Sequence, residues 1–536
     1  MIKNYQFQDQ HIKIECKSIE QSGKNLKIYG KRVSIRIPFK INEYYQHGWQ
    51  SWSLTSWIKP GKYPGKSSPK SLQVLQTDLP YSELDHPNGS WLGAVSNNEN
   101  KILFLGSLDL NAHVEILENE LVGTNETLSG KWFLSFGDEK EVFTNYTILL
   151  ESELGKSKIN ISPKVWCSWY SFYEEISEDY IIKVCEDLLN YPFDVIQIDD
   201  GWQNKVGDWI PNKKFPSGMG ALADKIHQMG KKPGLWLAPL LVVPSSELFK
   251  NHKDWLLKSE NGCLVNAGFN WNEELFALDT TNPEVLDWLK KLMETVRNWG
   301  YDYIKLDFLY AGALNGVRYE DIPRETAFRL GLKTLREATG DAFLLTCGTP
   351  ILPSIGLCDA MRIGPDVFGE WSPFIENRLL NNYAVPGVQN AIRTSLNRLW
   401  LKPLVQTDPD VVYFQEKGNY LSSDQKNLLR ALAEISNYKA TSEIPHLNTP
   451  DEKKELLNFF LDYPLVKKIS RYKYQVGNRY YDFTDTMALL SDLTIFETFL
   501  QWFVNGLSKF KFVLIIFGKI NSFQRKQTIK KIFQSK

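Results

Sequence analysis

The sequence lacks the features that would mark a membrane protein or a nucleic-acid-binding protein. No apolar run approaches the roughly 20 residues that span a bilayer, and the closest, Phe512–Phe517, is far shorter. The 62 Lys and Arg residues nearly balance the 63 Asp and Glu residues, which leaves a formal net charge of −1. Such a chain has no overall field to attract nucleic acid or an anionic membrane. Its first residues, MIKNYQFQDQHIKIECKS, contain no apolar core of a secretory signal, so we expect a cytoplasmic protein.

Cysteine is also scarce, with 6 residues in a chain of 536. None of them forms a C-x-x-C pair, which argues against a zinc site and a disulfide framework and suits a reducing compartment. The sequence therefore predicts neither a bound metal nor another cofactor.

Aromatic residues, by contrast, are abundant: 17 Trp, 24 Tyr and 29 Phe. Most of them are expected to fill the cores of two or three domains, because the chain is too long for one ordinary core. Indoles beside polar residues suit a second role. A pyranose packs its C–H patches on an aromatic face while its hydroxyls form hydrogen bonds.

Residues 1–160 show the period-two alternation of antiparallel strands. Examples are Leu26–Gly30, Val33–Ile37 and Lys101–Leu105, which are bounded by Gly, Asn and Pro. An antiparallel β-sandwich is the simplest assembly of such strands. No helix of convincing length is expected in this domain.

From Val165 onward, apolar strands alternate with segments of helical periodicity, which predicts a parallel sheet. Such repetition over residues 161–440 favours a closed (β/α)8 TIM barrel over an open sheet. The expected strands are 165–170, 194–200, 233–239, 301–308, 342–348 and 360–366, with two more near 384–397 and 401–410. The expected helices are 177–191, 220–229, 282–299, 323–339, 388–399 and 423–435.

Residues 441–536 give a weaker pattern, which predicts a small C-terminal domain that is β-rich or divergent, with a hairpin at 472–483. From Gly506 to Lys536 the chain carries eight Lys or Arg residues and no acid. A solvated tail is the favoured interpretation, and a basic surface for a partner is the alternative.

Four acids stand where three of the predicted strands end. Asp199 and Asp200 follow the second strand, Asp307 ends the fourth and Asp366 ends the sixth. A single Asp at the end of a strand is more often a helix cap. Four Asp residues at the ends of three strands are less easily explained in this way. Because the active site of a parallel barrel lies at the C-terminal ends of its strands, we expect these carboxylates to share one rim.

Cations and indoles accompany these acids. Lys305 lies two residues before Asp307, so both side chains point to the same face of an extended strand. A cation there would keep Asp307 ionised, as a nucleophile requires. The other side chains expected on the rim are Arg362, Trp236, Cys347, Trp169 and Tyr170. Paired carboxylates at such a rim are what hydrolysis of a glycosidic bond requires.

Several segments, in the same order, are similar to the α-galactosidases of glycoside hydrolase family 36. They are WCSWYSFY at 166–173, IQIDDGWQ at 196–203, PGLWLAP at 233–239, YIKLDFLYAGA at 303–313, LLTCGTP at 344–350 and MRIGPD at 361–366. HGWQSWS at 47–53 resembles the contribution of that family's N-terminal β-domain to the active site, and DPD at 408–410 resembles its segment after the last barrel strands. So many motifs in one order make the resemblance highly specific.

The resemblance implies a role for each of these residues. Asp307 would be the nucleophile and Asp366 the general acid/base of a retaining reaction. The residues implied to bind galactose are Asp199 and Asp200 at the 4- and 6-hydroxyls, Lys305 and Arg362 at ring hydroxyls, Cys347 near the 2-hydroxyl and Trp236 at the C5–C6 edge. Trp169 and Tyr170 would line the pocket, Trp52 would reach in from the β-domain, and Asp208 would lie on the aglycone side.

The sequence therefore predicts a retaining α-galactosidase that acts on small oligosaccharides of the raffinose and melibiose type. An α-N-acetylgalactosaminidase or a galactosyl transferase of the same fold is the close alternative, and assays with nitrophenyl α-galactoside and its N-acetyl analogue would separate the first two. A non-catalytic sugar-binding protein is less favoured because Asp307 and Asp366 are both present. An aldolase with a Schiff base on Lys305 fits poorly, because nothing in the sequence suggests a phosphate site.

Overall fold

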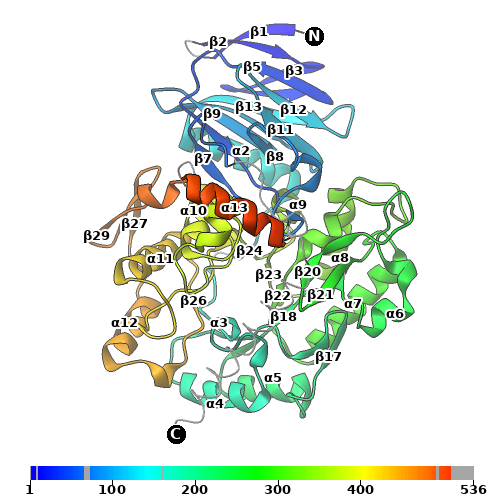
Figure 1. The fold of residues 1–536 in the computed structure, drawn as a ribbon, viewed down its shortest axis with the longest axis vertical. Coiled ribbons are helices and arrows are strands. Elements are labelled where there is room, and N and C mark those ends of the chain that lie inside the picture. The colour runs from blue at the N-terminus through cyan, green and yellow to red at the C-terminus, as the bar shows by residue number, and fades with distance from the viewer. Residues whose placement is uncertain (1, 8–9, 65–72, 160, 490–493, 509–536) are drawn as a thin grey trace.

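The computed structural model describes residues 2–7, 10–64, 73–159, 161–489 and 494–508. In Figure 1 a part rich in strands, coloured blue to cyan, lies above a larger part in which helices surround a parallel sheet. The N-terminus lies at the far end of the strand-rich part.

The chain before Glu139 forms two antiparallel sheets. The first has the strand order β1-β2-β5-β12-β11-β8, and the second has the order β3-β4-β13-β10-β9-β6-β7. The strands are β1 Ile2–Phe7, β2 Gln10–Glu15, β3 Ser18–Ser22, β4 Asn25–Tyr29, β5 Arg32–Arg36, β6 Glu43–Gln46, β7 Ser56–Ile58, β8 Asn88–Ser90, β9 Leu92–Ser96, β10 Lys101–Ser107, β11 Ala112–Ile116, β12 Glu120–Asn125 and β13 Lys131–Asp138.

The two sheets share one hydrophobic core. Ile14 and Ile35 from the first sheet are fully buried in it, as are Leu103 and Trp132 from the second. Buried and exposed residues alternate along β2 and β5, as period-two patterning requires when one face of a sheet is covered. The strands predicted at 26–30, 33–37 and 101–105 are confirmed.

Helix α2 (Glu139–Leu154) shows that the expectation of no long helix before residue 160 was wrong. It begins after Asp138, whose carboxylate accepts hydrogen bonds from the Lys140 and Glu141 backbone N–H groups at 2.9 and 3.2 Å. Its buried residues are Val142, Phe143, Tyr146, Thr147 and Leu150. These residues recur at intervals of three or four, as expected for the buried face of a helix. The opposite face is not uniformly polar, because it includes Ile148, which is 59% exposed, and this weakened the helical pattern in the sequence.

Eight parallel strands form one curled sheet in the larger part. Their order is β25-β24-β23-β22-β18-β15-β14-β26. They are β14 Val165–Cys167, β15 Val195–Ile198, β18 Lys232–Leu237, β22 Tyr303–Leu306, β23 Phe343–Thr346, β24 Ala360–Arg362, β25 Gln406–Asp408 and β26 Ala440–Thr441. The first six overlap the six strands predicted with defined limits, which are thereby confirmed.

The last two strands differ in part from the prediction. No strand forms at 384–397, where helix α10 (Val388–Arg398) lies instead, with ten of its residues buried. The overlapping helix prediction at 388–399 was the correct one. The stretch 401–410 does contain β25, whereas β26 has only two residues, too few to show any periodicity. The Val412 backbone N–H donates to the Ala440 carbonyl at 2.9 Å, which joins the chain after β25 to β26.

Helices alternate with these strands and cover the outer face of the sheet (Figure 1). They are α3 Trp169–Phe172, α4 Glu178–Leu188, α5 Gly218–Gln228, α6 Glu247–Asn251, α7 Pro283–Asn298, α8 Arg324–Thr339, α9 Ile351–Ser354, α10 Val388–Arg398, α11 Ser423–Ser436 and α12 Pro450–Leu461. Short antiparallel pairs lie among the loops: β16 Gln203–Lys205 with β17 Asp208–Pro211, and β19 Leu241–Val242 and β20 Asn266–Asn270 on either side of β21 Glu273–Ala277. The helices predicted between 177 and 339, and the one at 423–435, are confirmed.

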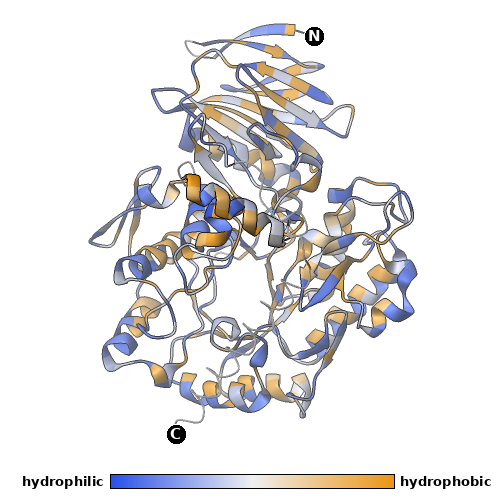
Figure 2. Cartoon of the chain, viewed as in Figure 1, coloured by the Kyte–Doolittle hydropathy of each residue, from blue (hydrophilic) through white to orange (hydrophobic). Residues whose placement is uncertain are grey.

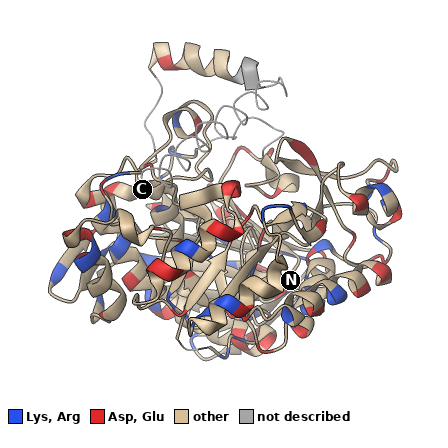
Figure 3. Cartoon of the chain, turned by 90° about the horizontal axis from the view of Figure 1, so that it is seen from below, with Lys and Arg blue, Asp and Glu red and all other residues tan. Residues whose placement is uncertain are grey.

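The C-terminal region contains a small antiparallel sheet of β27 (Val466–Ser470), β28 (Lys473–Val476) and β29 (Arg479–Asp482), which confirms the hairpin predicted at 472–483. Helix α13 (Ile495–Ser508) follows and stands apart from the body in Figure 3. Hydrophobic residues lie along it (Figure 2), and Trp502 is 73% exposed. The basic segment noted in the sequence lies outside the described residues from 509 onward.

No helix among the described residues is long and apolar enough to cross a membrane. In Figure 3 the acidic and basic residues are interspersed over the molecule rather than gathered by sign.

A buried arginine joins the strand-rich part to the parallel sheet. Arg398, at the end of α10, is fully buried, and its guanidinium donates to five backbone carbonyls. Four of these belong to the turn at residues 48–53, and the fifth belongs to Ile363, just after β24, with distances between 2.6 and 3.1 Å. This side chain therefore fixes the turn against the sheet.

We predict that Arg398→Met lowers the free energy of unfolding by at least about 3 kcal/mol. Each buried carbonyl left without a donor costs about 1–3 kcal/mol, and four carbonyls lose their donor together, because Gln50 keeps the Ser53 N–H. Urea unfolding followed by circular dichroism measures the change. Arg32→Met is the matched control, because Arg32 is exposed on β5 and should change stability by no more than about 0.5 kcal/mol. Equal stability of the two variants would contradict the proposed role of Arg398.

Candidate active site

An open cavity of about 250 Å³ lies at the C-terminal ends of the parallel strands. It is slightly smaller than the roughly 300–1,000 Å³ of pockets that hold drug-sized ligands, so the space suits a small ligand such as a single sugar ring. The lining residues are Trp52, Leu75, Gln76, Trp169, Asp199, Asp200, Trp236, Phe269, Asn270, Trp271, Lys305, Asp307, Phe308, Asp366, Ala384 and Pro386.

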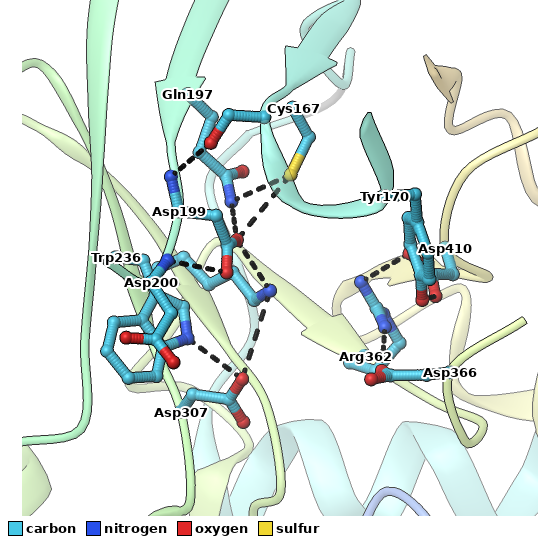
Figure 4. A network of polar contacts seen from close by, with 12 residues as sticks. Cys167, Tyr170, Gln197, Asp199, Asp200, Trp236, Asp307, Arg362, Asp366 and Asp410 are labelled. Atoms are coloured by element: carbon cyan, nitrogen blue, oxygen red, sulfur yellow. Dashed lines mark hydrogen bonds and ion pairs between the residues drawn. The ribbon is translucent and has the colours of Figure 1, made fainter. Parts of the chain in front are cut away.

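One side of the site is organised around Lys305. Its Nζ lies 3.0 Å from Asp199 Oδ2 and 3.8 Å from Asp307 Oδ2, and Trp236 Nε1–H donates to the same Asp307 oxygen at 3.0 Å (Figure 4). Burial alone would lower the pKa of Lys305, but Asp199 and Asp307 outweigh that effect and raise it well above its usual value. Lys305 therefore remains a cation and provides Asp307 with a fixed positive neighbour.

The other side is organised around Arg362. Its Nη1 lies 2.9 Å from Asp366 Oδ1, its Nε 2.9 Å from Asp408 Oδ2 and its Nη2 2.9 Å from Asp410 Oδ1. Figure 4 shows this group beside Tyr170 and separate from the group around Asp199 and Asp307. Asp408 and Asp410 are buried, whereas 32% of the Asp366 side chain is exposed to the cavity.

Asp366 differs from Asp307 in its electrostatic surroundings. Burial and the negative charge of Asp410, with a smaller contribution from Asp307, raise the pKa of Asp366 to about 7 against the opposing effect of Arg362. Near pH 7 this carboxyl is therefore protonated in a substantial fraction of the molecules. It lines the same cavity as Asp307, which has Lys305 beside it.

Asp200 is the second carboxyl of the site with a raised pKa. Burial and the Glu174 carboxylate raise it to about 7, while hydrogen bonds from Gln203 and Trp271 partly oppose the rise. Gln203 Nε2 donates to Asp200 Oδ1 at 2.6 Å and Trp271 Nε1 to Oδ2 at 2.7 Å. Both carboxyl oxygens thus have a donor, and the group is held in one orientation.

Trp52 reaches the cavity from the turn at residues 48–53. That turn pairs with the segment after β23: Ser51 N–H donates to the Thr349 carbonyl at 3.1 Å, and Thr349 N–H donates back to Ser51 Oγ at 3.1 Å. The Trp52 ring packs edge-on against Phe308, with centroids 5.2 Å apart. Gly348 allows this approach, because a Cβ there would lie 3.0 Å from the indole and its φ is +53°.

Eight of the eleven side chains predicted for the site line the cavity: Trp52, Trp169, Asp199, Asp200, Trp236, Lys305, Asp307 and Asp366. The other three are not among the lining residues. Arg362 contacts Asp366 from beneath, Tyr170 O–H donates to Asp410, and Cys347 is fully buried. Burial and the nearby Asp307 raise the pKa of the Cys347 thiol well above its usual value.

Asp208 is not among the residues that line this cavity, so its expected place on the aglycone side remains a prediction. Its carboxylate accepts hydrogen bonds from the Glu247 and Leu248 backbone N–H groups at distances from 2.9 to 3.2 Å. These groups lie at the first turn of α6, where a carboxylate stabilises the helix.

Comparisons with known proteins agree with this geometry. Residues 133–336 match the family model described as Melibiase. The structure of TtGalA, an α-galactosidase from Thermus thermophilus in complex with p-nitrophenyl α-D-galactopyranoside, superposes with a TM-score of 0.87 at 39% sequence identity. That match covers 91% of this chain and 100% of the other. The chain belongs to the α-galactosidases of glycoside hydrolase family 36.

Curated members of the family match over shorter stretches. AgaA from Geobacillus stearothermophilus is 29% identical over 139 residues, which is 24% of this chain and 18% of AgaA. Mel36A from Lactobacillus acidophilus is 27% identical over 181 residues, or 32% of this chain and 24% of Mel36A. The aligned part thus spans less than a quarter of the length of these curated relatives.

The sequence interpretation missed the contribution of the β20–β21 hairpin. Trp271 lies at its turn with a left-handed φ of +50°, donates to Asp200 and packs 6.2 Å from the Trp236 ring. Phe269 and Asn270 from the same hairpin also line the cavity. The available signal was a tryptophan between two asparagines, a polar setting of the kind that favours sugar contact.

We predict that Trp271→Phe raises the pKa of Asp200 further above about 7, because it removes a hydrogen bond that favours the charged carboxylate. Carbon-13 NMR titration of the aspartate carboxyl groups measures the change, with Asp200→Asn used to assign the signal. Trp288→Phe, on α7 outside the cavity lining, is the matched control and should leave the titration unchanged. An Asp200 titration unaltered by Trp271→Phe would show that the indole N–H does not stabilise the charge.

Proposed function

We propose that this chain is a retaining α-galactosidase in which Asp307 is the nucleophile and Asp366 the general acid/base. The observation that carries the proposal is the unequal state of the two carboxyls on one cavity. Asp307 has a buried lysine and an indole N–H beside it, whereas Asp366 carries a proton near neutral pH. Double displacement at a glycosidic bond requires one carboxyl in each of these states.

In the first step Asp307 attacks the anomeric carbon from the β face and forms a covalent β-glycosyl ester. Asp366 transfers its proton to the departing glycosidic oxygen, which leaves as an alcohol. Trp236 N–H and Lys305 hold one oxygen of Asp307, and the Phe308 backbone N–H donates to the other at 2.8 Å. The nucleophile is therefore oriented before the sugar arrives.

In the second step Asp366 acts as a base. Ester formation removes the negative charge of Asp307, and loss of a like charge lowers the pKa of Asp366, which is by then ionised. It accepts a proton from water as the water oxygen attacks the anomeric carbon and displaces Asp307. Two inversions return the α configuration.

The wall of the cavity supports galactose as the sugar. Asp199 and Asp200 provide acceptors for neighbouring hydroxyls such as O4 and O6, Lys305 provides a donor, and the indoles of Trp236, Trp169 and Trp52 provide apolar faces. We assign Arg362, Tyr170 and Cys347 to the layer behind this wall. TtGalA structures in complex with p-nitrophenyl α-D-galactopyranoside and with stachyose support small α-galactosides as substrates.

We further propose that the curled sheet is a closed (β/α)8 barrel spanning residues 161–440. A β-sandwich domain would occupy 1–160, and a C-terminal domain would occupy 441–536. The hydrogen bond from Val412 to Ala440 at the two sheet edges supports closure, and the shared core of the two N-terminal sheets supports the sandwich. The six cysteines, all free thiols, are compatible with a cytoplasmic location.

Azide rescue tests the assignment of the two carboxyls. We predict that Asp307→Ala abolishes turnover of 4-nitrophenyl α-galactoside and that azide restores it with β-galactosyl azide as product, because azide enters the vacated β face. Asp366→Ala keeps the nucleophile and with azide should give the α-galactosyl azide. Proton NMR of the anomeric hydrogen distinguishes the products.

The two variants control for each other, since each removes one carboxyl from the same cavity. If Asp307→Ala gave the α-azide and Asp366→Ala did not give the β-azide, the retaining mechanism would be wrong. If the two variants gave the opposite azides from those expected, the roles of Asp307 and Asp366 would be exchanged.

A further inference from the structure

Arg362 is shared by three carboxylates. Asp366, Asp408 and Asp410 each contact a different nitrogen of its guanidinium at 2.9 Å. If all three acids were ionised, this buried group would carry two negative charges in excess. Burial of uncompensated charge is costly, and a titratable group commonly takes up a proton instead.

The hydrogen bonds decide which acid takes that proton. Asp408 accepts from the Asp410 backbone N–H at 2.8 Å and from Arg362 Nε. Asp410 accepts from Arg362 Nη2, from the Val367 backbone N–H at 3.0 Å and from Tyr170 O–H. Each oxygen of these two carboxylates therefore has a donor, which favours the ionised form.

Asp366 has the fewest hydrogen bonds that would stabilise a negative charge. Of the described residues, only Arg362 donates to its carboxyl group, through Nη1 to Oδ1. Arg362 is also shared with Asp408 and Asp410, which have further donors of their own. Asp366 is therefore the acid with the fewest hydrogen bonds to stabilise an anion.

We propose that Asp408 and Asp410 are positioning residues that occupy Arg362 and thereby keep the proton on Asp366. The proposal rests on the proposed function, in which Asp366 is the general acid. Neither residue touches the sugar, since both lie behind the cavity wall with 2% exposure. They act through Arg362 and through the charge that they place beside Asp366.

The other groups around Asp366 do not replace this effect. Lys305 favours the anionic form of Asp366, and Asp307 disfavours it less than Asp410 does. The hydroxyls of Tyr170 and Tyr413 and the thiol of Cys347 are neutral near pH 7, because burial raises the pKa of each well above its usual value. Asp410 is thus the principal charged neighbour that keeps the acid protonated.

Asp410→Asn removes this charge with little change in shape. Asp410 has a left-handed φ of +80°, a conformation that Asn tolerates about as well as Asp. Without the negative neighbour, and with Arg362 freed toward Asp366, the proton should leave Asp366 at lower pH. Loss of the negative neighbour and the closer approach of Arg362 both lower the pKa of Asp366.

The test is the pH dependence of kcat/KM, which reports the ionisation of the free enzyme. For methyl α-galactoside, whose poor leaving group needs the acid, we predict that Asp410→Asn moves the alkaline limb about one unit toward lower pH. At pH values above the alkaline limbs of both the wild type and the variant, a shift of one pH unit corresponds to about tenfold lower kcat/KM. The loss should be smaller for 4-nitrophenyl α-galactoside, because its leaving group needs little protonation.

Asp359→Asn is the matched control. Asp359 also pairs with a half-buried arginine, Arg336, at 2.7 Å and accepts from the Leu344 backbone N–H, but it lies before β24, away from Asp366. This variant should lose stability without moving the limb. Asp408→Asn is the second test variant, and its limb should move in the same direction as that of Asp410→Asn.

The outcomes separate the two proposals. No hydrolysis of α-galactosides by the wild type, or an alkaline limb that survives in Asp366→Ala, would refute the proposed function and the inference with it. Suppose that Asp366→Ala removes the alkaline limb of the wild type, whereas Asp410→Asn leaves it in place or moves it to higher pH. This result would refute the inference but not the proposed function. If Asp410→Asn lowered kcat/KM equally for both substrates, Asp410 would have a purely structural role and the inference would be wrong. The same holds if neither Asp410→Asn nor Asp408→Asn folded.

Discussion

The site depends first on a buried cation that binds no carboxylate. Arg398 holds the turn at residues 48–53 through four backbone carbonyls and reaches Ile363 with a fifth contact. Burial lowers the pKa of Arg398 to about 9, so the group remains a cation at neutral pH. Its N–H groups donate to backbone carbonyls, which are hydrogen-bond acceptors that suit a cation. Because the same turn carries Trp52, this contact, together with the pairing of Ser51 with Thr349, holds the strand-rich part and the parallel sheet in one cavity wall.

Two further buried cations divide the acids of the cavity between them. Lys305 lies between Asp199 and Asp307, whereas Arg362 lies among Asp366, Asp408 and Asp410. Lys305 meets two carboxylates and Arg362 meets three, so the second group has the larger excess of negative charge. This imbalance is a simple physical reason why a proton is retained more readily on the Arg362 side than on the Lys305 side, as the proposed roles of Asp366 and Asp307 require.

The sequence predicted much of this arrangement, because parallel strands bring their ends together whatever the loops between them do. Asp199, Asp307 and Asp366 could be placed on one rim from strand ends alone. The loops were less accessible: Trp271 lies on a hairpin whose approach to Asp200 is set by tertiary packing, and Asp410 meets Arg362 across 48 positions of sequence. Resemblance placed Cys347, Tyr170 and Arg362 at the sugar, and these roles remain predictions, because none of the three is among the residues that line the cavity.

Backbone conformation explains why those loop contacts are specific. Phe308, Trp271 and Asp410 adopt left-handed φ values of +53°, +50° and +80°, which cost energy in most non-glycine residues and persist only where the surroundings impose them. Each one adjoins or contributes a group of the site: Phe308 follows Asp307, Trp271 binds Asp200, and Asp410 binds Arg362. A chain that accepts this strain at three separate loops gains side chains with fixed directions. Fixed directions matter here because the electrostatic difference between the two acids depends on which oxygen each donor reaches.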